Sequence, residues 1–150
     1  MAILRMLAGK YGYSATEPKD IYCQENALSC LDDYLNGKTW HMFFSEEIST
    51  DQMTAWTDSL KKLFKFLNEL LEEHKGAYLA GEKMTIADFS CWGGLACIAN
   101  VALCTTNPKK PAATKAMQEV LAQFETLSTW SQRMATENAD YMSTRNPCTF

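Results

Sequence analysis

The stretch of sequence that decides the fold is LAGEKMTIADFSCW, residues 79–92, because it marks the start of a capped helix. Thr85 stands at the N-cap, where its hydroxyl can accept a hydrogen bond from the Asp88 N–H while the Asp88 carboxylate accepts one from the Thr85 N–H. The negative charge of Asp88 also suits the positive end of the helix dipole. Met84 and Phe89 occupy the two positions of a hydrophobic staple. We therefore predict a structural cap and staple formed by Met84, Thr85, Asp88 and Phe89.

The helix that follows this cap carries apolar side chains on nearly every side as far as Cys104. Gly93, Gly94 and several alanines lie within it, and such small residues let neighbouring helices approach closely. A helix that is apolar around its whole circumference belongs in the centre of a protein. The sequence therefore predicts a long buried helix from Thr85 to Cys104.

The composition of the whole chain supports a helical fold. A length of 150 residues is enough for one domain. Alanine and leucine, which are strong helix formers, dominate the apolar residues, whereas valine, which strands favour, occurs only at Val101 and Val120. We therefore expect an all-α bundle of about six helices with no sheet.

Five further helices are predicted from apolar periodicity and from helix start and stop signals. The clearest covers residues 49–74, where Ser49 and Gln52 form a capping-box pattern and apolar residues recur at steps of three and four. A proline at its start and an asparagine–glycine pair at its end delimit another at residues 18–36. The remaining helices are expected at residues 1–11, 112–124 and 127–136.

Charge and hydropathy exclude two classes of partner. The net charge is −4, whereas nucleic-acid binding needs clustered Lys and Arg, so we expect no nucleic-acid partner. No stretch approaches the roughly 20 apolar residues that cross a bilayer, so we expect no membrane span. The first residues also lack a signal-peptide pattern.

The six cysteines are expected to be free and mostly buried thiols. They form no CxxC pattern, and the two histidines, His41 and His74, lie far apart in the sequence, so no metal site is expected. Free thiols indicate an intracellular reducing compartment, with the cytoplasm as the default and an organelle left open.

Paired carboxylates and aromatic residues are the other candidate functional groups. The pairs Asp32–Asp33 and Glu46–Glu47 are adjacent in sequence, and adjacent residues on a helix do not face each other. Nothing places a nucleophile beside a base, so we expect no catalytic, cofactor-binding or metal-binding residue. Trp40, near Phe43 and Phe44, is the best candidate for an exposed contact surface, whereas the other tryptophans are expected in the core.

Taken together, these segments resemble the glutathione S-transferase family. In that family a turn like residues 79–84 leads into a T-x-A-D cap at the start of the central helix of the C-terminal domain. MAILRMLAGKYGY (1–13) resembles the last helix of the family's thioredoxin-like domain, and EPKDIYCQENALSCLDDYL (17–35) resembles the first helix of its helical domain. FETLSTWSQRM (124–134) and YMSTRNPCTF (141–150) resemble its last helix and tail. The resemblance implies a short helix at 1–12 from the end of a thioredoxin-like domain and a helical domain at 13–150.

The resemblance also implies that this chain lacks most of the family's thioredoxin-like domain. In the family the thioredoxin-like domain binds glutathione and supplies the catalytic residue, and this chain begins at the last helix of that domain. We therefore expect no cofactor in this chain, and glutathione only if a thioredoxin-like domain is present elsewhere. In several classes an Asp of the first helix of the helical domain reaches glutathione; the matching position here is Cys30, with Asp32 and Asp33 close by.

Two functions follow from the resemblance. The first is a non-catalytic interaction or scaffold subunit of a larger assembly, which binds a protein partner or forms a homodimer through the outward faces of helices 18–36 and 49–74. The alternative is the C-terminal portion of an active glutathione transferase, which conjugates glutathione to hydrophobic electrophiles. In that alternative, residues 35–44 and 142–150 line the hydrophobic substrate site. A third, weaker interpretation is a bundle that merely converges on the pattern.

Overall fold

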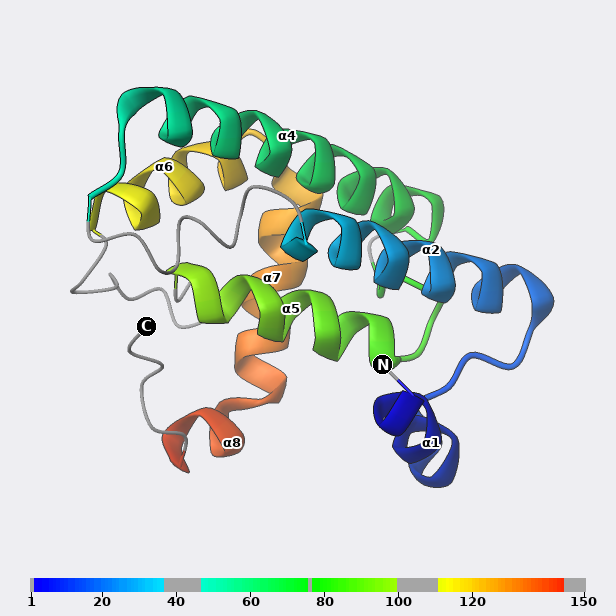
Figure 1. The fold of residues 1–150 in the computed structure, drawn as a ribbon. Helices are drawn as coiled ribbons and strands as arrows, with labels where there is room; N and C mark the ends of the chain where they lie inside the picture. The colour runs from blue at the N-terminus through cyan, green and yellow to red at the C-terminus, as the bar shows by residue number, and fades with distance from the viewer. Residues whose placement is uncertain (1, 37–46, 76, 100–110, 145–150) are drawn as a thin grey trace.

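The computed structural model describes residues 2–36, 47–75, 77–99 and 111–144 (Figure 1). These residues form seven helices and no strand, and their one extended pairing is an isolated bridge between Tyr78 and Gly81. The all-α prediction is confirmed. The helices are α1 (Ala2–Tyr11), α2 (Pro18–Tyr34), α4 (Thr50–Glu73), α5 (Ile86–Ala99), α6 (Pro111–Leu121), α7 (Glu125–Glu137) and α8 (Ala139–Thr144).

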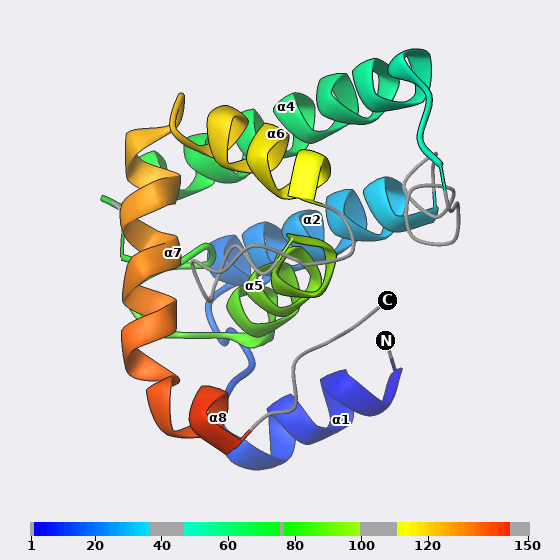
Figure 2. The same cartoon turned by 90° about the vertical axis from the view of Figure 1, so that its left-hand side faces the viewer.

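Helix α5 lies at the centre of the arrangement and packs against α1, α2, α6 and α7 (Figures 1 and 2). Helices α2 and α4 lie side by side and run in opposite directions, and α6 packs on α4. Helix α7 runs across the ends of these helices, while α1 and α8 sit at the edge of the bundle (Figure 2). The predicted central helix is therefore confirmed as far as Ala99; its last predicted residues, 100–104, lie outside the described residues.

The core is built mainly from one face of α4 and the helices that contact it. Residues at steps of three and four along α4 are buried, from Trp56 to Leu71. Three tryptophans are buried as expected, and the indole N–H of Trp56 donates to the Tyr34 hydroxyl at 2.8 Å. The fourth, Trp40, lies outside the described residues. The tryptophans of the core are Trp56, Trp92 and Trp130.

The start of α4 follows from its own sequence. The Gln52 N–H donates to Ser49 Oγ at 3.2 Å, and the Ser49 N–H donates to Gln52 Oε1 at 2.9 Å. This reciprocal pair is the predicted capping box, and it satisfies two donors that a helix start leaves free. The helix ends at Glu73, with His74 as the C-cap.

Helix α7 starts earlier than predicted, and a side chain of another helix caps its first turn. Helix α7 begins at Glu125 rather than at residue 127, and its N-cap residue, Phe124, offers no side-chain oxygen. Instead, Asn68 of α4 accepts a hydrogen bond from the Leu127 N–H at 3.1 Å through its Oδ1 atom. A donor of the first turn is thus satisfied across the fold, which sequence signals beside the helix do not show.

Two further boundaries differ from the prediction. Helix α6 begins at Pro111 and ends at Leu121, shorter than the predicted 112–124. A short helix, α8, follows α7 at Ala139–Thr144 and was not predicted. The hydroxyls of Ser143 and Thr144 donate to the Asp140 carbonyl, which stabilises this last turn locally. The division of the chain into 1–12 and 13–150 stays a prediction.

Candidate functional site

Asp88 is fully buried, and its carboxylate accepts four hydrogen bonds. Its Oδ1 atom accepts from the Leu79 N–H at 2.9 Å and from the Trp130 indole N–H at 3.0 Å. Its Oδ2 atom accepts from the Thr85 N–H at 2.8 Å and from the Thr85 hydroxyl at 3.0 Å. One carboxylate therefore joins the loop before α5, the first turn of α5 and the middle of α7.

The direction of one bond in this cap differs from the expectation. The Thr85 hydroxyl was expected to accept from the Asp88 N–H, but it donates to the Asp88 carboxylate. The Asp88 N–H instead donates to the Thr85 carbonyl at 3.1 Å. A carboxylate is a stronger hydrogen-bond acceptor than a neutral oxygen. The Thr85 hydroxyl therefore donates to the charged Asp88 side chain.

Burial raises the pKa of the Asp88 carboxyl above its ordinary value, because a charge without water is costly. The hydrogen bonds from Leu79, Thr85 and Trp130 act in the opposite direction and offset only part of this effect. All of these partners are donors, so they satisfy the ionised form. The arrangement is that of a structural anchor, since no oxygen of Asp88 is left for a substrate.

Loop residues before α5 are also held by α7. The Tyr78 hydroxyl donates to the Glu137 carboxylate at 3.0 Å, and the Arg133 guanidinium lies over the Tyr78 ring at 5.8 Å. Arg133 also donates to the Ala77 carbonyl. Together with the bond from Trp130, these contacts fix the position of residues 77–88 against one face of α7.

The staple residues are both half-buried and pack against the core. Phe89 meets Tyr13 edge to face, with ring centroids 5.1 Å apart. A direct contact between Met84 and Phe89 stays a prediction. The ring contact ties the linker after α1 to the first turn of α5, together with a hydrogen bond from the Ile86 N–H to the Tyr13 carbonyl at 2.8 Å.

The described thiols are poorly suited to nucleophilic catalysis. Cys23 and Cys91 are buried, Cys30 is half-buried, and all three are free. Burial raises the pKa of each thiol, so none is held as a thiolate. In the described ranges, no three His, Cys, Asp or Glu side chains gather as metal ligands would.

An apolar surface covers α1, where the sequence shows a band of Ile3, Leu4, Met6 and Leu7. Only Ala8 of this helix is buried, whereas Ile3 is 71% exposed and Met6 is 64% exposed. Beside the helix lies an apolar groove of about 300 Å³ between α1 and the first turns of α5. Its lining includes Leu4, Leu7, Tyr11, Tyr13, Ile86 and Phe89. We call this surface the α1 face.

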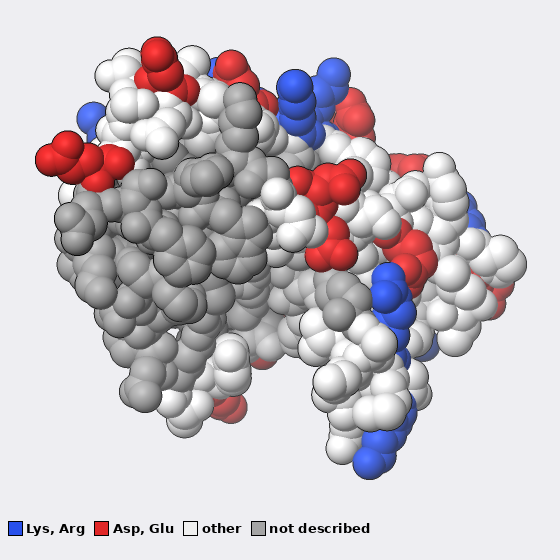
Figure 3. Space-filling view, viewed as in Figure 1, with Lys and Arg blue, Asp and Glu red and all other residues white. Residues whose placement is uncertain are grey.

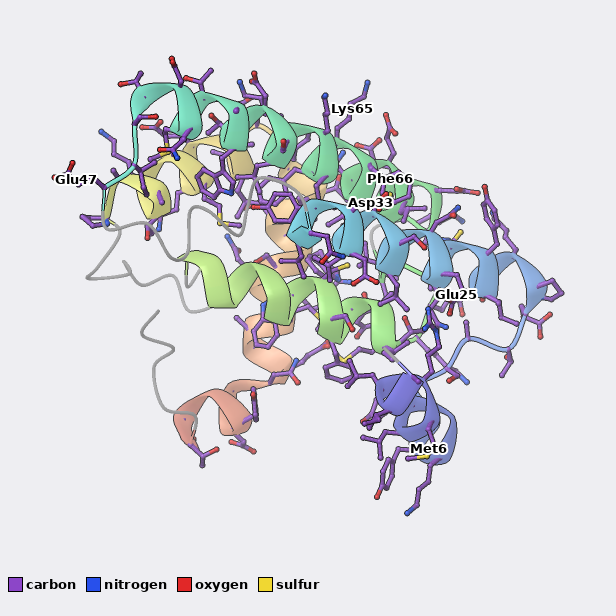
Figure 4. The ribbon with its side chains drawn as sticks, in the orientation of Figure 1. Met6, Glu25, Asp33, Glu47, Lys65 and Phe66 are labelled. Atoms are coloured by element: carbon purple, nitrogen blue, oxygen red, sulfur yellow. The ribbon has the colours of Figure 1, made fainter. Side chains whose placement is uncertain are left out.

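A second groove, of about 250 Å³, lies between α2 and α4. Buried Tyr34 and Leu63 form its floor with half-buried Cys30 and Phe66, and exposed Asp33 and Lys62 stand at its rim. Figure 4 shows Asp33 on α2 beside Phe66 on α4. Cys30 lies in this groove with Asp33, while Asp32 is exposed; the match of Cys30 to a glutathione-reaching Asp stays a prediction. We call this surface the α2–α4 groove.

Other candidates named from the sequence are not brought together. Asp32, Asp33 and Glu47 are exposed, and Glu46 lies outside the described residues, as does the aromatic patch at Trp40. No helix in the described ranges is both long enough and apolar enough to cross a membrane. The sequence did not predict that the Leu79 N–H and the Trp130 indole donate hydrogen bonds to Asp88. Nothing around residue 130 shows whether a tryptophan forms such a bond or only packs in the core.

Two comparisons with known proteins relate this chain to glutathione S-transferases. A family model described as "Glutathione S-transferase, C-terminal domain" matches residues 33–139. The crystal structure of the glutathione S-transferase Blo t 8 is similar, with a TM-score of 0.75 and 18% sequence identity. The match covers 98% of this chain and 62% of that chain, so this chain spans less than two thirds of that transferase. No curated protein matches the sequence significantly.

Proposed function

This chain belongs to the glutathione S-transferase family through its C-terminal helical domain, and on this premise we propose that it acts as a non-catalytic protein-interaction module of a larger assembly. The observation that carries the proposal is the α1 face. A folded protein seldom leaves a helix with so many large apolar side chains in water unless a partner covers them.

The α1 face has the composition of a docking surface. Ile3, Leu7 and Tyr11 are spaced four residues apart and so form one stripe along the helix. Covering a large apolar side chain stabilises a complex by about 1.5–3 kcal/mol at full burial. Ile3, Met6 and Tyr11 are each more than 60% exposed, so a partner gains most of that amount from each.

The chemistry of the described residues supports a non-catalytic role. Both oxygens of the buried Asp88 carboxylate already accept hydrogen bonds from groups within the fold, four in all. The thiols of Cys23 and Cys91 are buried, and burial raises their pKa values. Neither group is available as an acid, base or nucleophile toward a bound molecule.

The α2–α4 groove is the second surface that we propose for assembly. It lies on the helices whose outward faces the sequence assigns to a protein partner or a homodimer. Its apolar floor and charged rim match the usual pattern of an interface, in which an apolar centre is surrounded by polar residues.

The α1 face also favours one alternative, in which the chain is the C-terminal portion of an active glutathione transferase that conjugates glutathione to hydrophobic electrophiles. A thioredoxin-like domain would then cover the α1 face and supply the glutathione site. The resemblance of residues 1–13 to the last helix of such a domain supports this alternative. Both functions use the α1 face, but only the alternative predicts chemistry.

Activity assays separate the two functions. The purified chain is passed over immobilised glutathione and assayed for conjugation of glutathione to 1-chloro-2,4-dinitrobenzene. We expect no retention and no conjugation; measurable conjugation by the chain alone refutes the module. The same assays are repeated after a transferase thioredoxin-like domain is fused before residue 1. Restored conjugation by the fusion favours the alternative, whereas an inactive, folded fusion supports the module.

The expected compartment stays part of this proposal. The described cysteines, Cys23, Cys30 and Cys91, are all free thiols, which suits a reducing intracellular compartment such as the cytoplasm. A fluorescent fusion of the chain, expressed in its own cells, would test this point directly.

A further inference from the structure

We propose that the α1 face binds an amphipathic helix of a partner protein, whose apolar stripe enters the groove between α1 and α5 and whose acidic flank lies beside Lys10. This inference rests on the proposed function, because it names the kind of partner that the α1 face takes. It makes no use of the α2–α4 groove.

The groove has the shape and the lining that the apolar stripe of a helix requires. Leu4, Leu7 and Tyr11 form its α1 side, and Ile86 and Phe89 form its α5 side. The three α1 residues follow one another at steps of three and four, so they lie along one line of the helix over about two turns. None of the lining residues is charged. A partner helix that presents apolar residues at the same steps can pack along this line.

The apolar surface continues from the groove toward one flank of α1. Ile3 lies four residues before Leu7, on the same stripe, and is 71% exposed. Lys10 lies three residues after Leu7 and seven after Ile3, so its stem borders the same flank. A helix seated in the groove therefore covers Ile3 and brings its own flank to Lys10.

The charges of α1 select an acidic flank on the partner. The helix carries Arg5 and Lys10 and no acidic residue. Arg5 is paired with Glu25 of α2 at 2.7 Å, whereas none of the described ion pairs involves Lys10. The Lys10 ammonium lies 5.3 Å from the centre of the Tyr11 ring, at the edge of the groove. A carboxylate on the partner gives this exposed cation an ion pair and fixes the orientation of the bound helix.

The same charges disfavour two other occupants. A second copy of the chain would place two α1 helices together, and both carry only basic residues, so like charges would meet. An anionic bilayer would extend beyond α1 to its surroundings, and Figure 3 shows acidic side chains over the neighbouring α2. A single helix, with a diameter of about 10 Å, can lie on α1 and avoid these acids.

The test uses two synthetic peptides of about five helical turns, each labelled with fluorescein. Both carry leucine along one stripe at steps of three and four; the flanking positions are glutamate in the first peptide and lysine in the second. Binding to the full chain is measured by fluorescence anisotropy at low salt. We expect the acidic peptide to bind about threefold more tightly than the basic one, the range of an exposed ion pair. Lys10→Glu should reverse this preference, and high salt should reduce it.

A second pair of variants tests the groove. Leu4→Lys places a charge in the apolar lining and should weaken the acidic peptide at least ~10-fold, because most of the contribution of one large apolar side chain is lost. Ile21→Lys, on α2 and outside the groove, is the matched control, since Ile21 is 42% exposed and Leu4 is 47% exposed. It should leave the affinity unchanged. Circular dichroism verifies that both variants are folded.

Three outcomes would overturn the inference. The first is that neither peptide binds, or that Lys10→Glu leaves the preference unchanged. The second is flotation of the chain with vesicles of phosphatidylcholine and phosphatidylserine that Leu4→Lys abolishes, which would assign the α1 face to a lipid surface. The third is a dimer in analytical ultracentrifugation that Leu4→Lys abolishes, which would assign it to a second copy.

Failure of this inference differs from failure of the proposed function. Conjugating activity of the chain alone would refute the non-catalytic module and leave the preference for the acidic peptide intact. Loss of that preference, in a chain without conjugating activity, would overturn the acidic helix and leave a module whose partner has another chemistry.

Discussion

The replacement of Asp88 by Asn is the sharpest test of the structure, because it keeps the shape of the side chain and changes its acceptors. Asp88 accepts four hydrogen bonds, two at each oxygen. The amide of Asn has one oxygen, so two of these donors meet an NH₂ group instead. The Thr85 hydroxyl can rotate to accept, but a backbone or indole N–H cannot. At least one buried donor is thus left without a partner, and an interaction with a charge is lost.

The expected loss can be worked from these contacts. A buried donor without a partner costs about 1–3 kcal/mol, and each hydrogen bond to a charged group contributes about 1.5–3 kcal/mol. We therefore expect D88N to lower the free energy of unfolding by roughly 3 kcal/mol, of the order of a quarter to a half of the stability of an ordinary domain. An exposed cap, by contrast, contributes about 1 kcal/mol.

Urea unfolding followed by circular dichroism at pH 7 measures this loss. Ser49→Ala is the matched control, because it removes an exposed cap of α4 and should cost only about 1 kcal/mol. Trp130→Phe removes a single donor to Asp88, and its effect should be much smaller in the D88N background than in the wild type. If D88N costs no more than Ser49→Ala, Asp88 is an ordinary cap and the anchor described above is wrong.

The pH dependence of the same pair of proteins tests the protonation of Asp88. Burial raises the pKa of Asp88, so the folded chain binds its proton more tightly than the unfolded chain does. The stability that this group contributes is complete below the ordinary Asp pKa of about 3.9 and declines as the pH rises through the folded value. The advantage of the wild type over D88N should therefore shrink from pH 4 to pH 7. If the advantage instead grows with pH, the four hydrogen bonds lower the pKa of Asp88 by more than burial raises it.

Two further predictions concern thiols and glycines. Iodoacetamide should alkylate the half-buried Cys30 before Cys91, which should react only after unfolding since it is fully buried; peptide mass mapping over time would show the order of these two, and early labelling of Cys91 would contradict its burial. Gly81→Ala should cost roughly 2 kcal/mol in urea unfolding, because φ is +124°, a backbone conformation that residues with a side chain rarely adopt. Gly93→Ala, in open space on α5, should instead stabilise by about 0.5–1 kcal/mol, and equal effects at both sites would refute the reasoning.

The features that the sequence predicted correctly are those whose partners lie within one helical turn. The capping box of α4 joins Ser49 and Gln52, three residues apart, and the Thr85 N–H meets the Asp88 carboxylate over the same separation. The apolar face of α4 is equally local, since its period of three to four residues follows from helix geometry. Such contacts depend on the backbone of a single helix, so the order of residues is sufficient to place them.

The candidate surfaces were predicted less well, because exposure depends on what packs nearby. The apolar band of α1 was evident in the sequence, but the sequence does not say that Ile3 and Met6 remain in water while Ala8 alone is buried. The helices of the α2–α4 groove were named as contact faces, yet the meeting of Cys30 and Phe66 in one groove required the antiparallel packing of α2 on α4.

By itself, the sequence determined that this protein is helical, where its long helices begin, and which family it resembles. Apolar periodicity and helix caps depend only on residues that lie close together in the sequence. Only the tertiary structure decided that Trp130 and Leu79 join the Asp88 anchor and that Asn68 caps α7. The partners in these contacts lie 9, 42 and 59 residues apart in the chain. The physical reason is that buried donors and acceptors must find partners wherever packing brings them, and packing is a property of the whole fold.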